Sequence, residues 1–202
     1  MSKTQVELAA AREAAQELIQ LLAPACARLE LAGSIRRARP QVGDIELVAI
    51  PQVAVVQYGL FGEPGGAVSL LTAKLHELKE RFEIGEFMKN GPRFKQFWFR
   101  VLPVDLFITT PAQWGVNFTI RTGSAEFSHF LVTPRKYGGA LPGHLRVRNA
   151  RVWHKDTALE TPEETDVFAW VGLEWLAPAQ REPGQNWAHY LRRGGGEHHA
   201  EG

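Results

Sequence analysis

The stretch LAGSIRRARPQVGDIELVAIP, Leu31–Pro51, contains a Gly-Ser step, two arginines and an acid–apolar–acid pattern that leads into a run of apolar residues. The apolar run after Asp44 predicts a buried strand. Residues i and i+2 of a strand point to the same face, so Asp44 and Glu46 project together while Ile45 points into the core. Two neighbouring carboxylates repel each other, and oxygen ligands of this kind suit Mg²⁺. The segment therefore predicts a strand that carries a metal-binding pair.

A third acid strengthens this interpretation. Asp105 lies in LPVDLFIT, a predicted strand that is otherwise apolar on both faces. If the two strands are neighbours, all three carboxylates converge, as a two-metal site requires. An ordinary solvated strand end is the alternative explanation for Asp44 and Glu46, but it does not account for Asp105 between valine and leucine.

Groups that bind anions precede the acids. Gly33 lets a ligand approach the backbone, Ser34 offers a hydroxyl and an amide, and Arg36 or Arg37 can hold phosphate oxygens. Anion-binding groups beside metal-binding groups predict a phosphorylated substrate that is held together with its metal.

Length and composition are those of a globular protein. The chain has 202 residues, a formal net charge of +1 and a single cysteine, Cys26. One cysteine excludes an intramolecular disulfide and a cysteine-based zinc cluster, which fits a reducing, intracellular setting. No apolar run approaches the ~20 residues of a membrane helix, and the charged amphipathic N-terminus is not a signal peptide. We expect an intracellular, non-secreted monomer that does not bind membranes.

Positive charge is segregated along the chain. Residues 89–100 contain four cations and no acid, and residues 135–155 contain six cations and no acid. Such strips on a nearly neutral protein are typical of a surface that binds a phosphate backbone, although a solvated face explains either strip alone.

The first half of the chain predicts an α/β (α+β) layer. Residues 4–22 form a predicted helix, because Thr4 and Glu7 make a capping-box pattern and apolar residues repeat on one face. The other predicted elements are a strand at 44–50, a loop at 58–67, a second helix at 68–78 and two strands at 94–110. This order predicts helices packed against a small mixed β-sheet.

The second half predicts a smaller α+β unit. A short helix is expected at 123–131 and a hairpin that turns at Asn149. A further helix is expected to begin with Thr161 as its N-cap and to end before Gly172.

These motifs resemble the nucleotidyltransferase superfamily and, more narrowly, the family X DNA polymerases, the DNA polymerase beta group. The palm of that family has Gly-Ser-x-Arg-Arg followed by Gly-Asp-x-Asp, which Gly33–Arg37 and Gly43–Glu46 match except for the final acid. Asp105 matches the third metal ligand. Thr122–Ser124 match a Thr-Gly-Ser motif of the thumb, and Thr161–Glu182 match nearly all of its C-terminal motif.

The resemblance covers about residues 8 to 190. It implies a nucleotidyltransferase palm at residues 1–112 and a small α+β thumb at 113–190. Residues 191–202 are expected to form a disordered tail.

The resemblance also implies roles. Asp44, Glu46 and Asp105 would bind two Mg²⁺ ions, and Asp105 would help to activate a primer 3′-hydroxyl for attack on a dNTP. The residues implied to hold the nucleotide are Gly33, Ser34, Arg37 and Gly43 at the phosphates, and Ile120, Arg121, Gly123, Ser124 and Ser128 at the sugar and base. The residues expected to contact DNA are Lys89, Arg93, Lys95, Arg135, Lys136, Arg146 and Arg148.

The chain departs from the family at sensitive positions. Glu46 replaces an aspartate, and its extra methylene predicts a slower enzyme or one that prefers Mn²⁺. Ile120-Arg121 replaces an aromatic pair that discriminates between sugars, and Ser128 stands where an asparagine commonly contacts the base. Sugar selection and fidelity are therefore open.

Three hypotheses follow. The first is a family X DNA polymerase of repair type that fills gaps in a primer–template with two Mg²⁺ or Mn²⁺ ions. The second is a template-independent terminal nucleotidyltransferase that acts on DNA or RNA ends. The third is a nucleic-acid-binding remnant whose metal site Glu46 has disabled.

Overall fold

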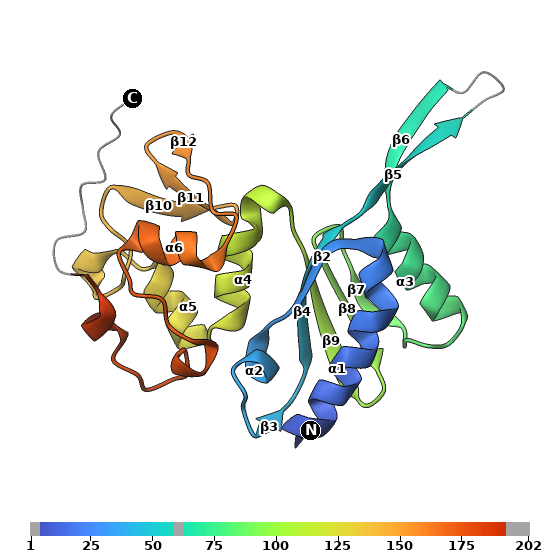
Figure 1. Cartoon of the computed structure of the whole chain (residues 1–202), viewed down its shortest axis with the longest axis horizontal. Helices are drawn as coiled ribbons and strands as arrows, with labels where there is room; N and C mark the ends of the chain where they lie inside the picture. The colour runs from blue at the N-terminus through green and yellow to red at the C-terminus, as the bar shows by residue number, and fades with distance from the viewer. Residues whose placement is uncertain (1–4, 59–62, 193–202) are drawn as a thin grey trace. The chain divides into compact units, whose positions relative to one another are not determined.

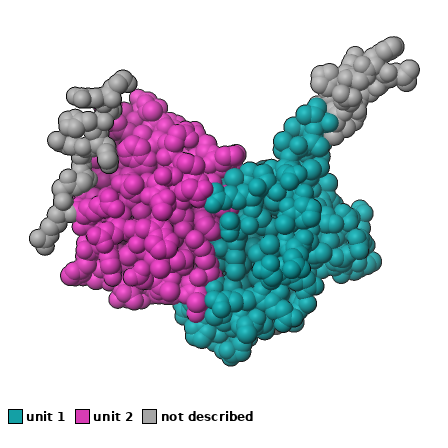
Figure 2. Space-filling view, in the orientation of Figure 1, with its two compact units in different colours: residues 1–35, 39–109 teal, residues 36–38, 110–202 magenta. Residues whose placement is uncertain are grey.

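The structure, a computed structural model, describes residues 5–58 and 63–192. The chain forms two compact units (Figure 2): Met1–Ile35 with Arg39–Thr109, and Arg36–Ala38 with Thr110–Gly202. The expected boundary after residue 112 lies three residues from the boundary between the units. Sequence reasoning did not predict that Arg36–Ala38 belong to the second unit.

The first unit is built on a five-stranded sheet. Its strands, in spatial order, are β2 (Cys26–Leu31), β4 (Ile45–Pro51), β9 (Leu102–Ile108), β8 (Phe94–Phe99) and β7 (Phe87–Asn90). Strands β4 and β9 are parallel and the other pairs are antiparallel. The predicted mixed sheet of an α+β fold is therefore confirmed, although the sequence did not reveal β2 or β7.

Two helices cover one face of this sheet. Helices α1 (Leu8–Leu22) and α3 (Leu70–Glu80) bury their leucines in a core shared with the strands (Figure 1). The predicted start of α1 is wrong: Glu7 is the N-cap, and Thr4 lies outside the described residues. Val6–Glu7 instead pair as a short strand, β1, with β3 (Gln41–Val42), so tertiary pairing takes these residues from the helix.

A two-stranded ribbon replaces most of the predicted loop at 58–67. Strands β5 (Val53–Tyr58) and β6 (Glu63–Ser69) pair antiparallel and extend away from the rest of the first unit (Figure 1). Ser69 then caps α3, because its Oγ accepts a hydrogen bond from the Thr72 amide at 3.2 Å. The short elements of the first unit are the 3₁₀ turn Ala23–Ala25 and helix α2 (Gly33–Arg36), whose last residue belongs to the second unit.

The second unit packs three helices around its own core. These are α4 (Trp114–Thr122), α5 (Ala125–Val132) and α6 (Glu164–Val171). A small antiparallel sheet of β10 (Leu145–Arg148), β11 (Arg151–His154) and β12 (Thr157–Ala158) joins them. Its 3₁₀ turns are Pro111–Gln113, Arg135–Tyr137, Pro178–Gln180 and Trp187–Tyr190. No helix in the described part of the chain is long and apolar enough to cross a bilayer.

The turn and cap chemistry of the second unit was partly predictable. The hairpin turns at Asn149 and Ala150, both with positive φ, as a tight turn between twisted strands requires. Gly172 ends α6 in the left-handed conformation, as predicted. The predicted N-cap is wrong, because Glu163 holds that position and forms a capping box with Asp166.

Leu191 and Arg192, the first two residues of the predicted tail, form contacts within the second unit. Leu191 forms a bridge with Leu173, and the Arg192 amide donates to Gly172 O at 2.9 Å. Residues 193–202 of the predicted tail lie outside the described residues.

Candidate active site

A row of polar side chains crosses the face of the first unit's sheet that lies opposite α1 and α3. Glu46 on β4 is in register with Asp105 on β9, Asp105 with Gln96 on β8, and Gln96 with Lys89 on β7. Residues in register on neighbouring strands point to the same face. The row therefore runs from two carboxylates through an amide to an ammonium group.

Alternation along the strands explains why these side chains share a face. Ile45 and Leu47 flank Glu46, and Val104 and Leu106 flank Asp105; all four are fully buried in the core with the helices. The acids between them must point the other way. Hydrophobic burial thus sets the register, and the register brings Glu46 beside Asp105.

Asp105 is further oriented by its neighbour on β8. The Gln96 side-chain amide donates a hydrogen bond of 2.7 Å to Asp105 Oδ1. A neutral donor fixes the orientation of the carboxylate without cancelling its charge, so Asp105 keeps its value as a ligand for a cation.

Asp44 immediately precedes β4 and lies two residues from Glu46, half-buried. The three carboxylates supply the hard oxygen donors that Mg²⁺ and Mn²⁺ prefer, and the register of β4 and β9 places two of them side by side. Within the described ranges, no group of three or more His, Cys, Asp or Glu side chains is placed so that it could hold a metal ion. The carboxylate oxygens are suitable ligands for two divalent ions, and the binding of these ions by all three carboxylates stays a prediction.

The longer glutamate has a specific neighbour. Gly33 has φ of +60°, and a Cβ built on it would lie 1.8 Å from Glu46 Oε2. The Glu46 carboxylate therefore packs directly against the Gly33 backbone. Only glycine fits here, because any side chain would meet both the strained φ and the carboxylate.

Ser34 and Gly43 both precede Asp44 in the sequence and belong to the first unit. The Ser34 Oγ is buried and has no hydrogen-bond partner among the described residues. A buried hydroxyl without a partner is costly, which is the expected state of a group that a ligand satisfies. Gly43 lies directly before Asp44 and is half-buried.

The three cations of the first unit that were predicted to contact DNA differ in their exposure. Lys89 and Arg93 are exposed, and the Lys89 ammonium lies 5.4 Å from the centroid of Phe94, which stacks on Phe107. Lys95 is only 4% exposed; its ammonium binds the side chain of Asn90, and burial lowers its pKa. This burial does not fit the predicted contact of Lys95 with DNA. Lys95 is therefore not among the residues that we propose to contact DNA.

The second unit contains a buried charge cluster that sequence reasoning missed. Both Glu164 oxygens accept hydrogen bonds of 2.8 Å from Arg36, and Arg181 donates to Glu164 Oε1 at 2.7 Å. Arg181 is fully buried, and its guanidinium also binds the Leu176 carbonyl. Arg36 further lies 3.9 Å above the Phe118 ring.

The cluster shifts the titration of its members. Burial raises the pKa of Glu164, but hydrogen bonds and attraction from Arg36 and Arg181 outweigh burial and hold that pKa below its usual value. Burial lowers the pKa of Arg181, against the opposing effect of Glu164. One buried carboxylate is therefore shared by two guanidinium groups and compensates part of their positive charge.

Arg37, predicted to bind a phosphate, is also engaged within the second unit. Its Nε donates to Glu182 Oε1 at 2.7 Å, and its guanidinium donates to the Thr122 carbonyl at 2.7 Å. These contacts leave part of its fork for another acceptor.

The other predicted nucleotide contacts lie in the second unit around the α4–α5 junction. Ser124 caps α5, since its Oγ accepts from the Phe127 amide at 3.1 Å, and the Ser128 hydroxyl donates to Ile120 O at 2.8 Å. A Cβ on Gly123 would lie 2.4 Å from the Phe127 ring. The residues of this set are Ile120, Arg121, Gly123, Ser124 and Ser128. Ser124, Ser128 and Gly123 thus have local structural roles. The other predicted nucleotide contacts, Gly33, Ser34 and Gly43, belong to the first unit.

The predicted DNA-contacting cations of the second unit also differ among themselves. The Arg135 guanidinium binds the carbonyls of Ala140 and Val171, at 3.2 and 2.8 Å. Lys136, Arg146 and Arg148 are exposed.

Comparison with known proteins agrees with this architecture. No family model matches the sequence, and no curated protein matches it significantly. A crystal structure of Leishmania infantum polymerase beta, in a ternary primer/template complex, matches with a TM-score of 0.66. The match covers 89% of this chain and 77% of that chain, at 14% sequence identity. The chain has a polymerase beta-like fold. At this identity the likeness establishes the fold alone.

Within the polymerase beta-like fold, two functional features escaped sequence reasoning. Gln96 lay in a strand that was predicted, and the two polar residues between Phe94 and Phe97 were the available signal. Glu164 and Arg181 were recognised only as motif residues, and no local pattern reveals that they meet Arg36 more than 120 positions away from Glu164 in the sequence.

Proposed function

We propose that this protein is a nucleotidyltransferase of the DNA polymerase type, which adds a dNTP to the 3′-hydroxyl of a DNA primer. The observation that carries this proposal is the register of Glu46 and Asp105 on two neighbouring parallel strands, with Asp44 two residues before Glu46. Like charges side by side are unfavourable unless a cation joins them. The polymerase beta-like fold supports the same assignment.

The three carboxylates would hold two divalent ions, Mg²⁺ or Mn²⁺. When bound, these ions would supply positive charge at the reacting phosphate and lower the pKa of the attacking hydroxyl. Each protein residue then has a separate task.

Asp105 would orient the primer end, and Gln96 would hold the Asp105 carboxylate in its rotamer through the 2.7 Å hydrogen bond. The Ser34 hydroxyl and the Gly43 backbone would position the nucleotide phosphates. Lys89, at the far end of the polar row, and Arg93 would hold DNA phosphates. Because these contacts are electrostatic, DNA binding would become weaker at high salt.

Glu46 makes a specific difference. Its carboxylate packs against Gly33, so one methylene moves the ligand toward the glycine backbone. We propose that this placement loosens the ion geometry and favours Mn²⁺, which accepts a wider range of geometries.

The same contact supports a second candidate, a protein that binds nucleic acid and does not catalyse transfer. In that case the Glu46 carboxylate would permanently occupy the space beside Gly33 that a phosphate needs. A terminal transferase without template dependence stays a third candidate.

One experiment separates the three. A labelled primer is extended on gapped DNA, on an open template and as a bare single strand, with each dNTP or rNTP and with Mg²⁺ or Mn²⁺. Templated addition that is lost in Asp105→Ala supports the polymerase, and addition to the bare strand supports the terminal transferase. DNA binding without addition under any condition overturns the proposal and supports the binding protein.

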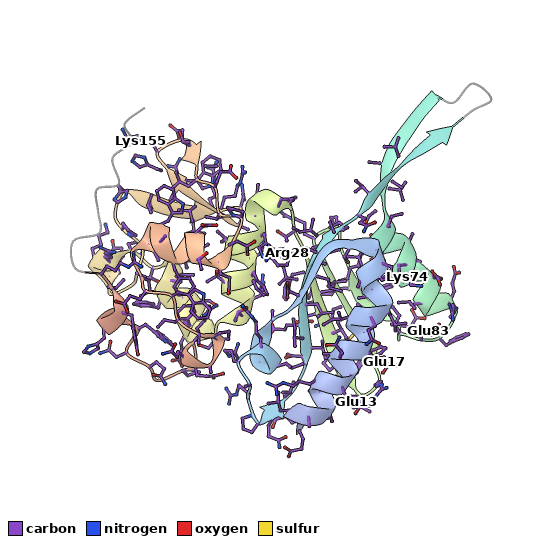
Figure 3. The ribbon with its side chains drawn as sticks, in the orientation of Figure 1. Glu13, Glu17, Arg28, Lys74, Glu83 and Lys155 are labelled. Carbon is purple, nitrogen blue, oxygen red and sulfur yellow. The ribbon has the colours of Figure 1, made fainter. Side chains whose placement is uncertain are left out.

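A matched control keeps the result interpretable. Glu83→Ala, in the same unit (Figure 3), removes one carboxylate that pairs with Arg81 and is not part of the polar row, so this variant should extend primers as the native protein does. A loss of activity in Glu83→Ala would show that the assay reports general damage.

A further inference from the structure

The small sheet of the second unit has one face in the core and one face in solvent. Leu145 and Val152 are buried, and their neighbours in register, His154 and Val147, share that side. The opposite face is formed by two pairs in register, Arg146 with Trp153 and Arg148 with Arg151. Three arginines and one tryptophan therefore share this face of the sheet, which we call the β10–β11 face.

The indole of Trp153 is held in place. Its Nε1 donates to the Arg148 carbonyl at 3.0 Å, and the Arg148 guanidinium lies 5.2 Å from the ring centroid. A fixed ring beside a cation presents a stacking surface and a phosphate partner at one point, and little conformational entropy is lost when a ligand binds.

A pocket lies where β10 begins and β11 ends, and of the residues on the β10–β11 face it includes Arg146. It has a volume of about 350 Å³ and is lined by His144, Arg146, His154 and Lys155 together with Gly143 and Leu145. The two imidazole rings are perpendicular, with their centroids 5.6 Å apart. Lys155 lies in the turn after β11 (Figure 3). Four nitrogen-bearing side chains around an open pocket suit an anion such as a phosphate group.

Two acids lie near these cations. Asp156 pairs with Arg146 at 3.0 Å and is fully exposed, and Glu160 lies 3.9 Å from Arg151. Exposed pairs of this kind contribute little and exchange readily for a phosphate. Arg148 and Lys155 form no ion pair with any described residue.

We propose that the β10–β11 face and its pocket bind single-stranded DNA, with one base stacked at Trp153 and the adjoining phosphates held by Arg146, Arg148 and Lys155. Charge and aromatic surface together favour this ligand, because stacking needs an unpaired base and the cations need a phosphate backbone. The inference rests on the proposed function only for the choice of DNA, and it assigns to the second unit a surface for an unpaired strand, such as template beyond the primer.

The test measures binding alone. Fluorescence anisotropy with a labelled oligothymidylate is recorded without divalent ions, on the full chain that carries Asp105→Ala, so that catalysis plays no part. Trp153→Ala should weaken binding by about fivefold or more, whereas Trp153→Phe should keep most of the affinity, since a phenyl ring still stacks. Arg146→Ala and Lys155→Ala should each reduce the slope of log K against log salt by about 0.7.

Matched controls separate this site from general effects. Trp175→Ala removes another exposed tryptophan, 48% exposed, and Arg81→Ala removes another exposed arginine, on the first unit. Both should bind single-stranded DNA as the parent protein does. Thermal melting of each variant checks that the fold is intact.

Three outcomes would overturn the inference. The first is unchanged binding in Trp153→Ala. The second is an equal loss on fully duplex DNA, because this would indicate backbone contacts without stacking. The third is a tenfold preference for RNA of the same sequence, which would remove the assignment to DNA. Weaker binding of Trp153→Ala, together with no primer extension by the native chain, would support this inference and contradict the proposed function, so the two fail independently.

Discussion

The two units of the chain treat their carboxylates in opposite ways. In the second unit, Glu164 is buried between Arg36 and Arg181, and the protein itself neutralises the charge. In the first unit, Glu46 and Asp105 lie side by side on a partly exposed sheet face, and Asp105 is oriented by the neutral amide of Gln96. The first arrangement places a carboxylate between two cations of the protein, and we propose that the second binds divalent ions.

Asp105→Asn should reduce primer extension by at least about 10³-fold, since a lost metal ligand costs several kcal/mol of transition-state stabilisation. The side chain keeps its size and its hydrogen bond with Gln96 through a carbonyl oxygen, so the melting temperature should change little. Single-turnover extension and calorimetry on the same sample measure both quantities. A large fall in melting temperature would place Asp105 among the structural carboxylates.

Glu164→Gln should instead lower the stability of the protein. It leaves two guanidinium groups without a charged partner in the second unit, which we expect to cost about 3 kcal/mol of unfolding free energy. Chemical denaturation measures the loss. Glu77→Gln, at an exposed ion pair with Lys74, is the matched control and should have almost no effect. Equal effects of the two substitutions would contradict a buried, stabilising cluster.

Gly33→Ala should disturb the site through Glu46. The added methyl meets the carboxylate and a φ of +60°, and we expect a loss of about 1–3 kcal/mol in stability or an equivalent loss of activity. Glu46→Asp shortens the side chain and should recover part of that loss, which a double-mutant cycle would reveal as coupling. Additive effects would show that the Glu46 carboxylate is not held against Gly33.

The cluster at Glu164 should also make stability depend on pH. The pKa of Glu164 in the folded protein is held below its usual value of 4.5, so its contribution is complete above that pH. As pH falls through the folded pKa, the carboxylate is protonated and the contribution is lost. The difference in melting temperature between the native chain and Glu164→Gln should therefore be largest near neutrality and shrink in acid. A difference that grows in acid would exclude this ion cluster as its source.

Lys95→Met should give the smallest effect and the opposite sign. Burial lowers the pKa of Lys95, which means that its charged form is unfavourable in the core, and a methionine of similar length should stabilise the chain by about 1 kcal/mol. Its DNA affinity should not change. Lys89→Met, at the exposed end of the polar row, should instead lower the salt slope of duplex binding by about 0.9. A reduced affinity in Lys95→Met would restore Lys95 to the DNA-binding set.

The buried face of strand β8 could not be predicted from the sequence. The segment FKQFWF carries aromatic residues at both parities, so periodicity does not decide which face is buried. Reasoning from charge predicted that Lys95 contacts DNA. In the structure Lys95 is 4% exposed, whereas Trp98 on the same strand is 42% exposed. Register with β9 decides the face, because Phe97 must join Val104 in the core.

Elements with local signals could be predicted from the sequence. Alternation in Asp44–Ile50 indicated which face of β4 carries the acids, Asn149 marked the hairpin turn, and Gly172 marked the end of α6. These signals act within a few residues, where backbone sterics and hydrophobic period decide the outcome.

The contacts between residues distant in sequence depend on the packing of whole elements and could not be predicted. The tertiary structure brought Gln96 to Asp105, packed Glu46 against Gly33, and placed Glu164 between two arginines from opposite ends of the chain. The physical reason is the same in each case. A polar group that is removed from water must find a partner, and the partner is selected by the packing of whole elements and not by its neighbours in sequence.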